Sequence, residues 1–284
     1  MGSSAVSRVE VQVRIVSWNM NHQRRSTEKR RRAWEYLRDE LRTDVALVQE
    51  ACPPEEFSSV YRPIGKDSYR WGSAVVSFRS DLMLHARPRV PLADCYLTAV
   101  SGDELPDSHP GACAVADVLD AAGRLQFTAI SLYGQWEVMP NQTIYSCARL
   151  HRMISDLTSV LATSRRRPVV LAGDLNTTTQ GAKMQESQAA VAFGRLHAWG
   201  LTDCIGHTRN TRDPLPICTC PDLKPCSHVR TYRHNNREES APTQWDYAFV
   251  SNTVISTLRE CRVVDDASAW ALSDHCPILL DIGD

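Results

Sequence analysis

The sequence predicts an α/β (α+β) protein in which two packed, mostly antiparallel β-sheets (a β-sandwich) are flanked by outer helices. Short runs of β-branched and aromatic residues follow one another between residues 73 and 131, with turn residues between them. Longer segments carry apolar residues at helical spacing, which suits helices that cover a sheet from outside. The 284 residues show no internal repeat and no linker-like shift in composition. We therefore expect a single domain over residues 9–284, preceded by a disordered tail at residues 1–8.

The strands are expected where β-branched residues dominate. The first is residues 9–16 (VEVQVRIV), and a short apolar strand follows at residues 44–48 (DVALV). Five runs in the central region would pair in antiparallel order through short loops: SAVVSF, LMLHA, YLTAV, CAVADVL and LQFTAISLY. Three later strands complete the set at residues 168–172, 244–250 and 277–282.

Three helices are expected between these strands. Ser26 and Thr27 are good N-caps for a helix that reaches residue 42 and carries Trp34 and Leu37 on one stripe. The other two helices span residues 141–161 and 184–199.

Charge and composition exclude several classes of protein. Lys and Arg total 32 against 33 Asp and Glu, a net charge of −1. This balance excludes a polybasic nucleic-acid coat, an acidic tail and a membrane binder that acts through bulk charge, but it leaves room for a local basic groove. No apolar stretch approaches the length of a membrane span, and no secretory signal follows the polar start. We expect a cytoplasmic monomer with reduced thiols and no membrane partner.

Polar side chains stand at the ends of five predicted strands and, for Asp246, inside the sixth. A polar residue at the end of an apolar strand is held by a rigid element while it faces a cleft. The residues are Asn19 and Asn21, Glu50, Tyr133 and Trp136, Asp174 and Asn176, Asp246, and Asp274 with His275.

This set of residues suits attack by water on a phosphate ester. A hard divalent cation such as Mg²⁺ or Mn²⁺ takes carboxylate oxygens, and Glu50, supported by Asp274 or Asn19, would supply them. Asp246 would fix the tautomer of His275 and stabilise its imidazolium form.

The remaining polar residues fit supporting roles. Asn176, Tyr133 and Asn19 would donate hydrogen bonds to phosphoryl oxygens. Asp174 would orient or deprotonate the water, or protonate the leaving oxygen.

The motifs SWNMN, VQE, GDLN, WDYAFVS and SDHCPI resemble, in order, those of the endonuclease/exonuclease/phosphatase superfamily. The resemblance covers residues 11–282 and implies the deoxyribonuclease-I-like four-layer fold. It assigns Asn19 to the family's first-strand Asn, Glu50 to its metal-binding Glu and Asp274 to its metal-side Asp. It also assigns Asp174 and Asn176 to the GDxN pair, and Asp246 and His275 to the Asp–His pair. Tyr133 stands where members carry His or Tyr.

These observations lead to three candidate functions. We expect a Mg²⁺-dependent phosphoesterase, foremost a nuclease on DNA or RNA. The alternative enzyme is a phosphatase or phosphodiesterase for a small phosphorylated metabolite or lipid. The non-enzymatic alternative is a zinc-stabilised binding module, against which the intact catalytic set argues.

A Cys- and His-rich loop insertion at about residues 213–229 is the second unusual feature. Cys218, Cys220, Cys226 and His228 form a ligand set suited to structural Zn²⁺, although the spacing is not a common zinc-finger spacing. Reduced thiols without a metal, or a disulfide, are the alternatives. The loop would border the cleft.

Substrate contacts are expected from four residues near this cleft: Arg230, Tyr232, Arg233 and Trp136. The arginine runs 24–32 and 165–167 are interpreted as solvated helix faces and loops, with contacts to substrate phosphates as the alternative.

Overall fold

The computed structural model describes residues 11–64, 71–91, 104–135, 146–178, 183–208, 228–234, 237 and 243–283. Several predicted features lie outside these residues. They are the tail at residues 1–8, the strand YLTAV, Trp136, the start of the 141–161 helix and most of the Cys/His loop with Cys218, Cys220 and Cys226.

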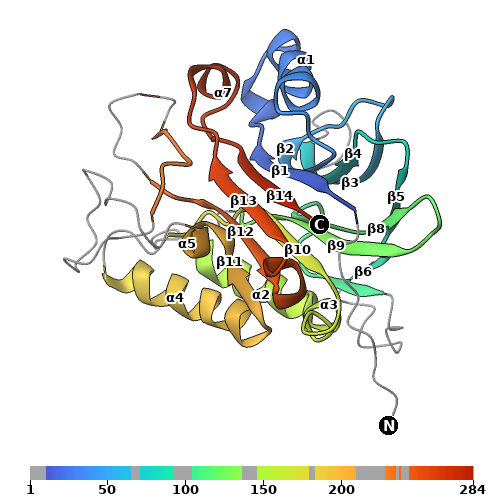
Figure 1. Ribbon diagram of the computed structural model, residues 1–284. Helices are drawn as coiled ribbons and strands as arrows, with labels where there is room; N and C mark the ends of the chain where they lie inside the picture. The colour runs from blue at the N-terminus through green and yellow to red at the C-terminus, as the bar shows by residue number, and fades with distance from the viewer. Residues whose placement is uncertain are drawn as a thin grey trace.

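Two mixed six-stranded sheets form the centre of the molecule (Figure 1). The first has the order β13-β14-β1-β2-β4-β3, with β13 (Leu258–Val263), β14 (Ile278–Ile282), β1 (Val13–Asn19), β2 (Val45–Ala51), β4 (Trp71–Ser77) and β3 (Ser58–Ile64). The second has the order β11-β12-β10-β9-β8-β5, with β11 (Leu201–Asp203), β12 (Asp246–Ser251), β10 (Val169–Asp174), β9 (Leu125–Tyr133), β8 (Cys113–Asp120) and β5 (Leu82–Ala86).

Each sheet is antiparallel except at one central pair. β1 runs parallel to β2, and β9 runs parallel to β10. The short strands β6 (Arg89–Pro91) and β7 (Leu105–Asp107) form a separate parallel pair. The expectation of a mostly antiparallel sandwich is therefore confirmed.

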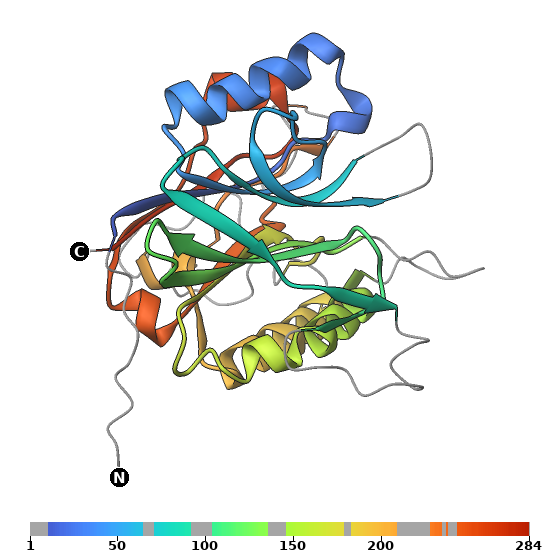
Figure 2. The same ribbon diagram turned by 90° about the vertical axis from the view of Figure 1, so that its right-hand side faces the viewer.

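Helices cover the outer face of each sheet, which gives four layers (Figure 2). On the first sheet lie α1 (Thr27–Glu35), its π-helical continuation η2 (Tyr36–Glu40) and α7 (Ala267–Leu272). On the second lie α2 (Ser146–Asp156), α3 (Thr158–Leu161) and α4 (Lys183–Ala198). The short elements η1 (His22–Arg24), α5 (Cys204–Thr208) and α6 (Asn252–Ile255) complete the chain. No helix within the described ranges is both long and apolar enough to cross a membrane.

The alternation of side chains along the strands explains the layers. In β1, Ile15 faces the core between the sheets, whereas Trp18 faces the other way and packs in the cluster of α1 with Trp34 and Leu37. The inter-sheet core pairs large side chains with small ones. The first sheet contributes mainly Val, Ile and Leu, and the second contributes five alanines: Ala114, Ala116, Ala129, Ala172 and Ala248.

Sequence reasoning missed five strands: the edge strands β3, β13 and β11 and the short pair β6 and β7. The two edge strands of the first sheet, β3 and β13, have a polar, exposed character. β3 (SSVYRPI) has no fully buried residue and contains a proline, which edge strands tolerate. β13 (LRECRV) buries Cys261 alone. Neither shows the apolar pattern from which a strand is predicted. The helix predicted at residues 141–161 is divided at Leu157 into α2 and α3 over its described part.

Packing in the inter-sheet core predicts that F127A and M83A differ strongly in their effect on the free energy of unfolding. Phe127, on β9, is fully buried between the sheets, so F127A is expected to lose about 3–5 kcal/mol of unfolding free energy through lost burial and a cavity. Met83, on β5, is 45% exposed, so M83A is expected to change stability by less than about 0.5 kcal/mol. Urea unfolding followed by circular dichroism measures both values, and equal losses would contradict this account of the core.

Candidate active site

The sheet topology brings six chain segments to one end of the sandwich. The carboxyl ends of a parallel pair meet at the same edge, so β1 and β2 deliver Asn19 and Glu50 there, and β9 and β10 deliver Tyr133 and Asp174. β12 and β14 run antiparallel to their neighbours β10 and β1, so their amino ends lie at the same edge.

The register fixes the neighbours within the second sheet. Asp174 pairs with Tyr133 on one side and with Asp246, the first residue of β12, on the other. Asp274 and His275 lie shortly before β14, separated from its first residue by Cys276 and Pro277.

A pocket of about 370 Å³ opens where these segments meet. Its described lining consists of polar and aromatic residues. They are Asn21, Gln23, Arg24, Glu50, Tyr133, Asp174, Asn176, Tyr232, His234, Trp245, Asp274 and His275.

The buried amide of Asn19 links the two sheets beneath this pocket. Its Nδ2 donates to Glu50 Oε1 at 3.2 Å and to Asp174 Oδ2 at 2.9 Å. Its Oδ1 accepts the backbone N–H of Asn21 at 3.0 Å. Asn19 is 0% exposed, so neither water nor a rotamer change competes easily for these contacts.

Glu50 is held by two further donors. The Tyr133 hydroxyl donates to Glu50 Oε1 at 2.7 Å, and Gln23 Nε2 donates to Oε2 at 2.9 Å. Burial, together with the negative charges of Glu50 and Asp174, raises the pKa of Tyr133 far above its ordinary value. The phenol therefore stays protonated and acts as a hydrogen-bond donor.

His275 and Asp246 form a buried ion pair. The imidazole Nδ1 lies 2.9 Å from Asp246 Oδ2, and Nε2 lies 3.8 Å from Asp174 Oδ2. Burial lowers the pKa of His275, but the charges of Asp246 and Asp174 outweigh it and raise the pKa to about 10. Burial also raises the pKa of Asp174, against the opposing charge of His275. The site thus holds an imidazolium beside a carboxyl group that binds a proton more readily than usual.

Hydrogen bonds between side chains and the backbone position the His275 segment. Trp18 Nε1 donates to the His275 carbonyl at 2.8 Å, and the Ser273 hydroxyl donates to the Asn19 carbonyl at 2.7 Å. On the Asp246 side, the Thr231 hydroxyl oxygen accepts the backbone N–H groups of Trp245 and Asp246 at 3.0 and 3.1 Å. These contacts tie the His–Asp pair to β1 and to the segment at residues 228–234.

Strained backbone is concentrated at the pocket. Asn21, Glu50 and Asn176 have φ values of 46°, 48° and 47°, a region that residues other than glycine seldom adopt. Gly134 meets a different constraint, because a Cβ there would stand 2.2 Å from the Leu175 carbonyl oxygen. Such positions occur where a site requires a particular side-chain direction.

The donor chemistry of the pocket fits a divalent cation. Glu50 and Asp274 supply carboxylate oxygens, and the buried Asn21 Oδ1 has no hydrogen-bond partner among the described residues, although Asn21 Nδ2 donates to Asp274 Oδ1 at 2.7 Å.

A second candidate set is Asp174, Asp246 and His275, whose potential ligand atoms lie within 4.8 Å of one another. Two of these groups already bond each other, and the raised pKa of His275 opposes the neutral imidazole that a metal requires.

The structure brings together eight of the residues predicted from sequence: Asn19, Glu50, Tyr133, Asp174, Asn176, Asp246, Asp274 and His275.

Among the expected substrate contacts, Tyr232 lines the pocket. Its ring stacks on Trp245 with centroids 4.0 Å apart and lies 4.8 Å from that of His275.

Neither predicted arginine contact, Arg230 or Arg233, is among the described residues that line the pocket. Arg233 lies over the Trp270 ring at 3.9 Å and 3.8 Å from Asp265. Trp136 and the three cysteines of the zinc set lie outside the described residues, and His228 is the one member of that set that is described.

Sequence reasoning missed four lining residues: Gln23, Arg24, His234 and Trp245. Trp245 directly precedes Asp246 in the WDY motif, so its position next to a predicted site residue could have marked it as a pocket residue. Gln23 and Arg24 stand in a polar, arginine-rich stretch, where the sequence gives no signal that distinguishes a residue lining a pocket from one facing solvent.

Comparison with known proteins agrees with this geometry. Residues 16–275 match the Endonuclease/Exonuclease/phosphatase family, whereas no curated protein matches the chain in sequence.

Three solved structures share the fold at low identity. The endonuclease domain of TRAS1, a telomere-specific non-LTR retrotransposon, is 17% identical with a TM-score of 0.60, covering 95% of this chain and 98% of its own. The AP endonuclease LMAP from Leishmania major is 14% identical with a TM-score of 0.65, at 96% and 88% coverage. An AP endonuclease from Archaeoglobus fulgidus is 16% identical with a TM-score of 0.62, at 96% and 99% coverage. Since the family match spans nearly the whole chain, the protein belongs to the endonuclease/exonuclease/phosphatase family and is a metal-dependent enzyme that hydrolyses phosphate esters.

Proposed function

We propose that the protein is a Mg²⁺- or Mn²⁺-dependent nuclease that hydrolyses phosphodiester bonds in DNA or RNA. One observation carries this proposal: Glu50, Asp174, Asp274 and the His275–Asp246 pair converge on a single pocket from both sheets. The names of the structural neighbours, two AP endonucleases and a retrotransposon endonuclease, support nucleic acid as the substrate class.

Glu50 and Asp274 would hold the cation, together with the carbonyl oxygen of Asn21, which has no hydrogen-bond partner within the described part of the chain. When bound, a divalent cation supplies positive charge that stabilises the phosphoryl oxygens as negative charge develops on them. Asn19 and Tyr133 fix the direction of the Glu50 carboxylate through their hydrogen bonds to Oε1.

The protein's own side chains would supply the hydrogen-bond donor to the phosphate and the base for the attacking water. His275, held protonated by Asp246, donates from Nε2 to a phosphoryl oxygen. Asp174 accepts the proton of the attacking water, because its pKa is raised and its carboxylate is oriented by Asn19 and Asn176. Asn176 Nδ2 bonds Asp174 Oδ2 at 3.0 Å, so the amide and the base act from adjacent positions.

A substrate panel tests the proposed activity. It compares single- and double-stranded DNA, abasic DNA, RNA, bis(p-nitrophenyl) phosphate and nucleotide monoesters, each with Mg²⁺, with Mn²⁺ and with EDTA. Metal-dependent cleavage of a nucleic acid is expected. Activity restricted to the small esters would overturn the nuclease assignment in favour of a small-ester phosphatase or phosphodiesterase.

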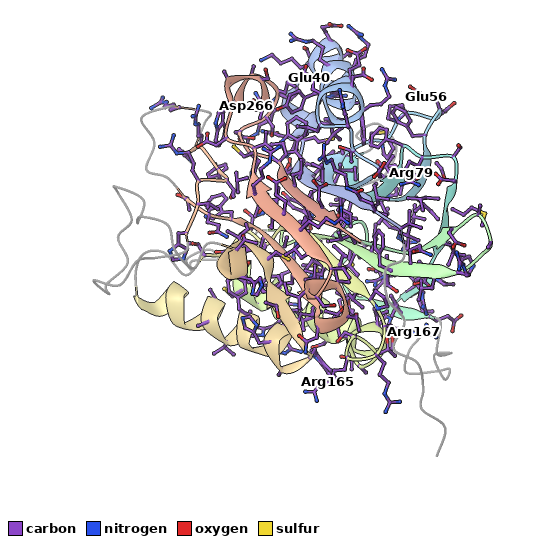
Figure 3. All side chains as sticks on the ribbon, in the orientation of Figure 1. Glu40, Glu56, Arg79, Arg165, Arg167 and Asp266 are labelled. Atoms are coloured by element: carbon purple, nitrogen blue, oxygen red, sulfur yellow. The ribbon has the colours of Figure 1, made fainter. Side chains whose placement is uncertain are left out.

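Removing the proposed metal ligand should abolish activity without unfolding the protein. E50Q keeps the shape of the side chain but loses its charge, so metal-dependent kcat/KM is expected to fall by at least about a hundredfold. E56Q is the matched control, because Glu56 is exposed in the β2–β3 connection and points outward (Figure 3). Wild-type activity in folded E50Q, checked by circular dichroism, would contradict the assignment.

The ion pair predicts a measurable change in the titration of His275. Without the Asp246 charge, burial dominates, so D246N is expected to bring the pKa of His275 well below its present value of about 10. NMR titration of the imidazole in metal-free protein measures this shift, with D265N, altered at a half-exposed acid outside the pair, as control. An unchanged pKa of His275 in D246N would show that the charge of Asp246 does not keep His275 protonated.

The His275–Asp246 ion pair also predicts how the stability of the protein changes with pH. The folded-state pKa of His275 lies above its ordinary value of 6.5. The contribution of the His275–Asp246 ion pair to the free energy of unfolding is therefore fully present below about pH 6.5 and is lost as the pH rises toward 10.

We further propose that Cys218, Cys220, Cys226 and His228 bind structural zinc. Protein purified under reducing conditions is expected to contain about one zinc per chain, which C218S/C220S should lose. Metal analysis by mass spectrometry measures this content. Less than about a tenth of an equivalent in the wild type would rule the site out.

A further inference from the structure

An exposed arginine at the mouth of the active-site pocket has no carboxylate partner among the described residues. Arg24 ends η1 and lines the pocket. Its neighbours differ: Arg25 lies 3.5 Å from Asp274, and Arg31 forms an ion pair with Glu28 at 2.7 Å. The Arg24 guanidinium is therefore available to an anion that enters the pocket.

The distribution of charge separates the mouth of the pocket from its floor. Glu50, Asp174 and Asp274 are each less than 9% exposed and make the floor acidic, which suits a cation and the phosphate that is cleaved. Arg24 is the one arginine or lysine among the described lining residues. It lies toward solvent, whereas Asn176 and His275, which face the same pocket, are 6% and 5% exposed.

Hydrogen-bond donors accompany Arg24 at the mouth. Burial and the charge of Asp274 raise the pKa of Tyr232 to about 12, while the Arg24 charge opposes this rise. The Tyr232 hydroxyl thus stays protonated, and it lies 3.3 Å from His234 Nδ1. Both residues line the pocket.

The other arginine run cannot serve this pocket. Residues 165–167 precede β10, whose opposite end carries Asp174. Figure 3 shows Arg165 and Arg167 at the α3 end of the molecule, directed outward. Arg165 also donates to the Ala198 carbonyl at 3.0 Å.

We propose that Arg24, together with the Tyr232 hydroxyl of the same pocket, binds a second phosphate of the substrate, adjacent along the strand to the phosphodiester that is cleaved. Phosphates follow one another at the regular spacing of a nucleic-acid strand, so a strand whose scissile phosphate occupies the floor presents another at the mouth. This inference rests on the proposed nuclease function and narrows the substrate to chains with at least two phosphates.

The test compares substrates that differ by one phosphate. The thymidine dinucleotide TpT has one phosphate and the trinucleotide TpTpT has two, and both are assayed with Mg²⁺ or Mn²⁺ per cleavable bond. The wild type is expected to prefer TpTpT. R24Q is expected to lower kcat/KM for TpTpT about tenfold more than for TpT, mainly through KM, because one charge-assisted contact is lost.

R32Q is the matched control. Arg32 is exposed on α1 but lines a different hollow with Glu35, Asp39 and Glu40. R32Q should retain the wild-type preference for TpTpT. On a longer oligonucleotide, R24Q should also flatten the slope of log(kcat/KM) against log[KCl] by about 0.7, the value for one contact to a single strand.

The outcomes separate this inference from the proposed function. A parallel loss on TpT and TpTpT in R24Q would place Arg24 on the scissile phosphate and overturn the inference, as would an unchanged ratio in R24Q or no wild-type preference. If the wild type, with either metal, cleaves neither oligonucleotide, nor bis(p-nitrophenyl) phosphate, nor any nucleic acid of the substrate panel, the proposed function itself fails.

Discussion

The Nδ2 group of Asn19 donates to Glu50 on the adjacent strand of its own sheet and to Asp174 on the opposite sheet. The proposed metal ligand and the proposed base thus share one fully buried amide. Because a buried donor that loses an acceptor is costly, the two sheet ends are held at a fixed separation. The positions of Tyr133 and Asn176, which bond these same carboxylates, follow from that separation.

Charge balance is the second constraint on the site. Four carboxylates meet within a small, largely buried volume, and such a group is stable only with compensating positive charge. The His275 proton compensates Asp246, and Arg25 lies near Asp274. Among the residues that the structure describes, Glu50 accepts hydrogen bonds from neutral donors alone, on Asn19, Tyr133 and Gln23. That deficit is the physical reason why a divalent cation fits beside Glu50 better than in the already neutralised His–Asp pair.

Much of this arrangement could be predicted from the sequence because its signal is local. Buried strands such as PVVLA show continuous apolar runs, and the polar residues that follow them stand out at once. The edge strand β3 gives no such signal, because its side chains are exposed and its character depends on pairing with β4.

Long-range packing limits the prediction for single residues. Arg24 and Arg233 look alike in sequence, yet η1 directs one to the pocket mouth, while the other packs on Trp270. The sequence near each arginine does not show which one reaches the pocket. Their surroundings are formed by residues that are distant in the chain and that only the folded structure brings together.

The alanines of the inter-sheet core have a consequence for activity as well as for packing. Ala116, Ala129 and Ala172 face larger side chains of the first sheet, so their small size sets how closely the two sheets approach. The hydrogen bond from Asn19 to Asp174 spans this same gap at its open end. An added methyl group in the core would push the sheets apart and lengthen the distance between the proposed metal ligand and the proposed base. Residues that never touch substrate thereby set a distance on which the chemistry depends.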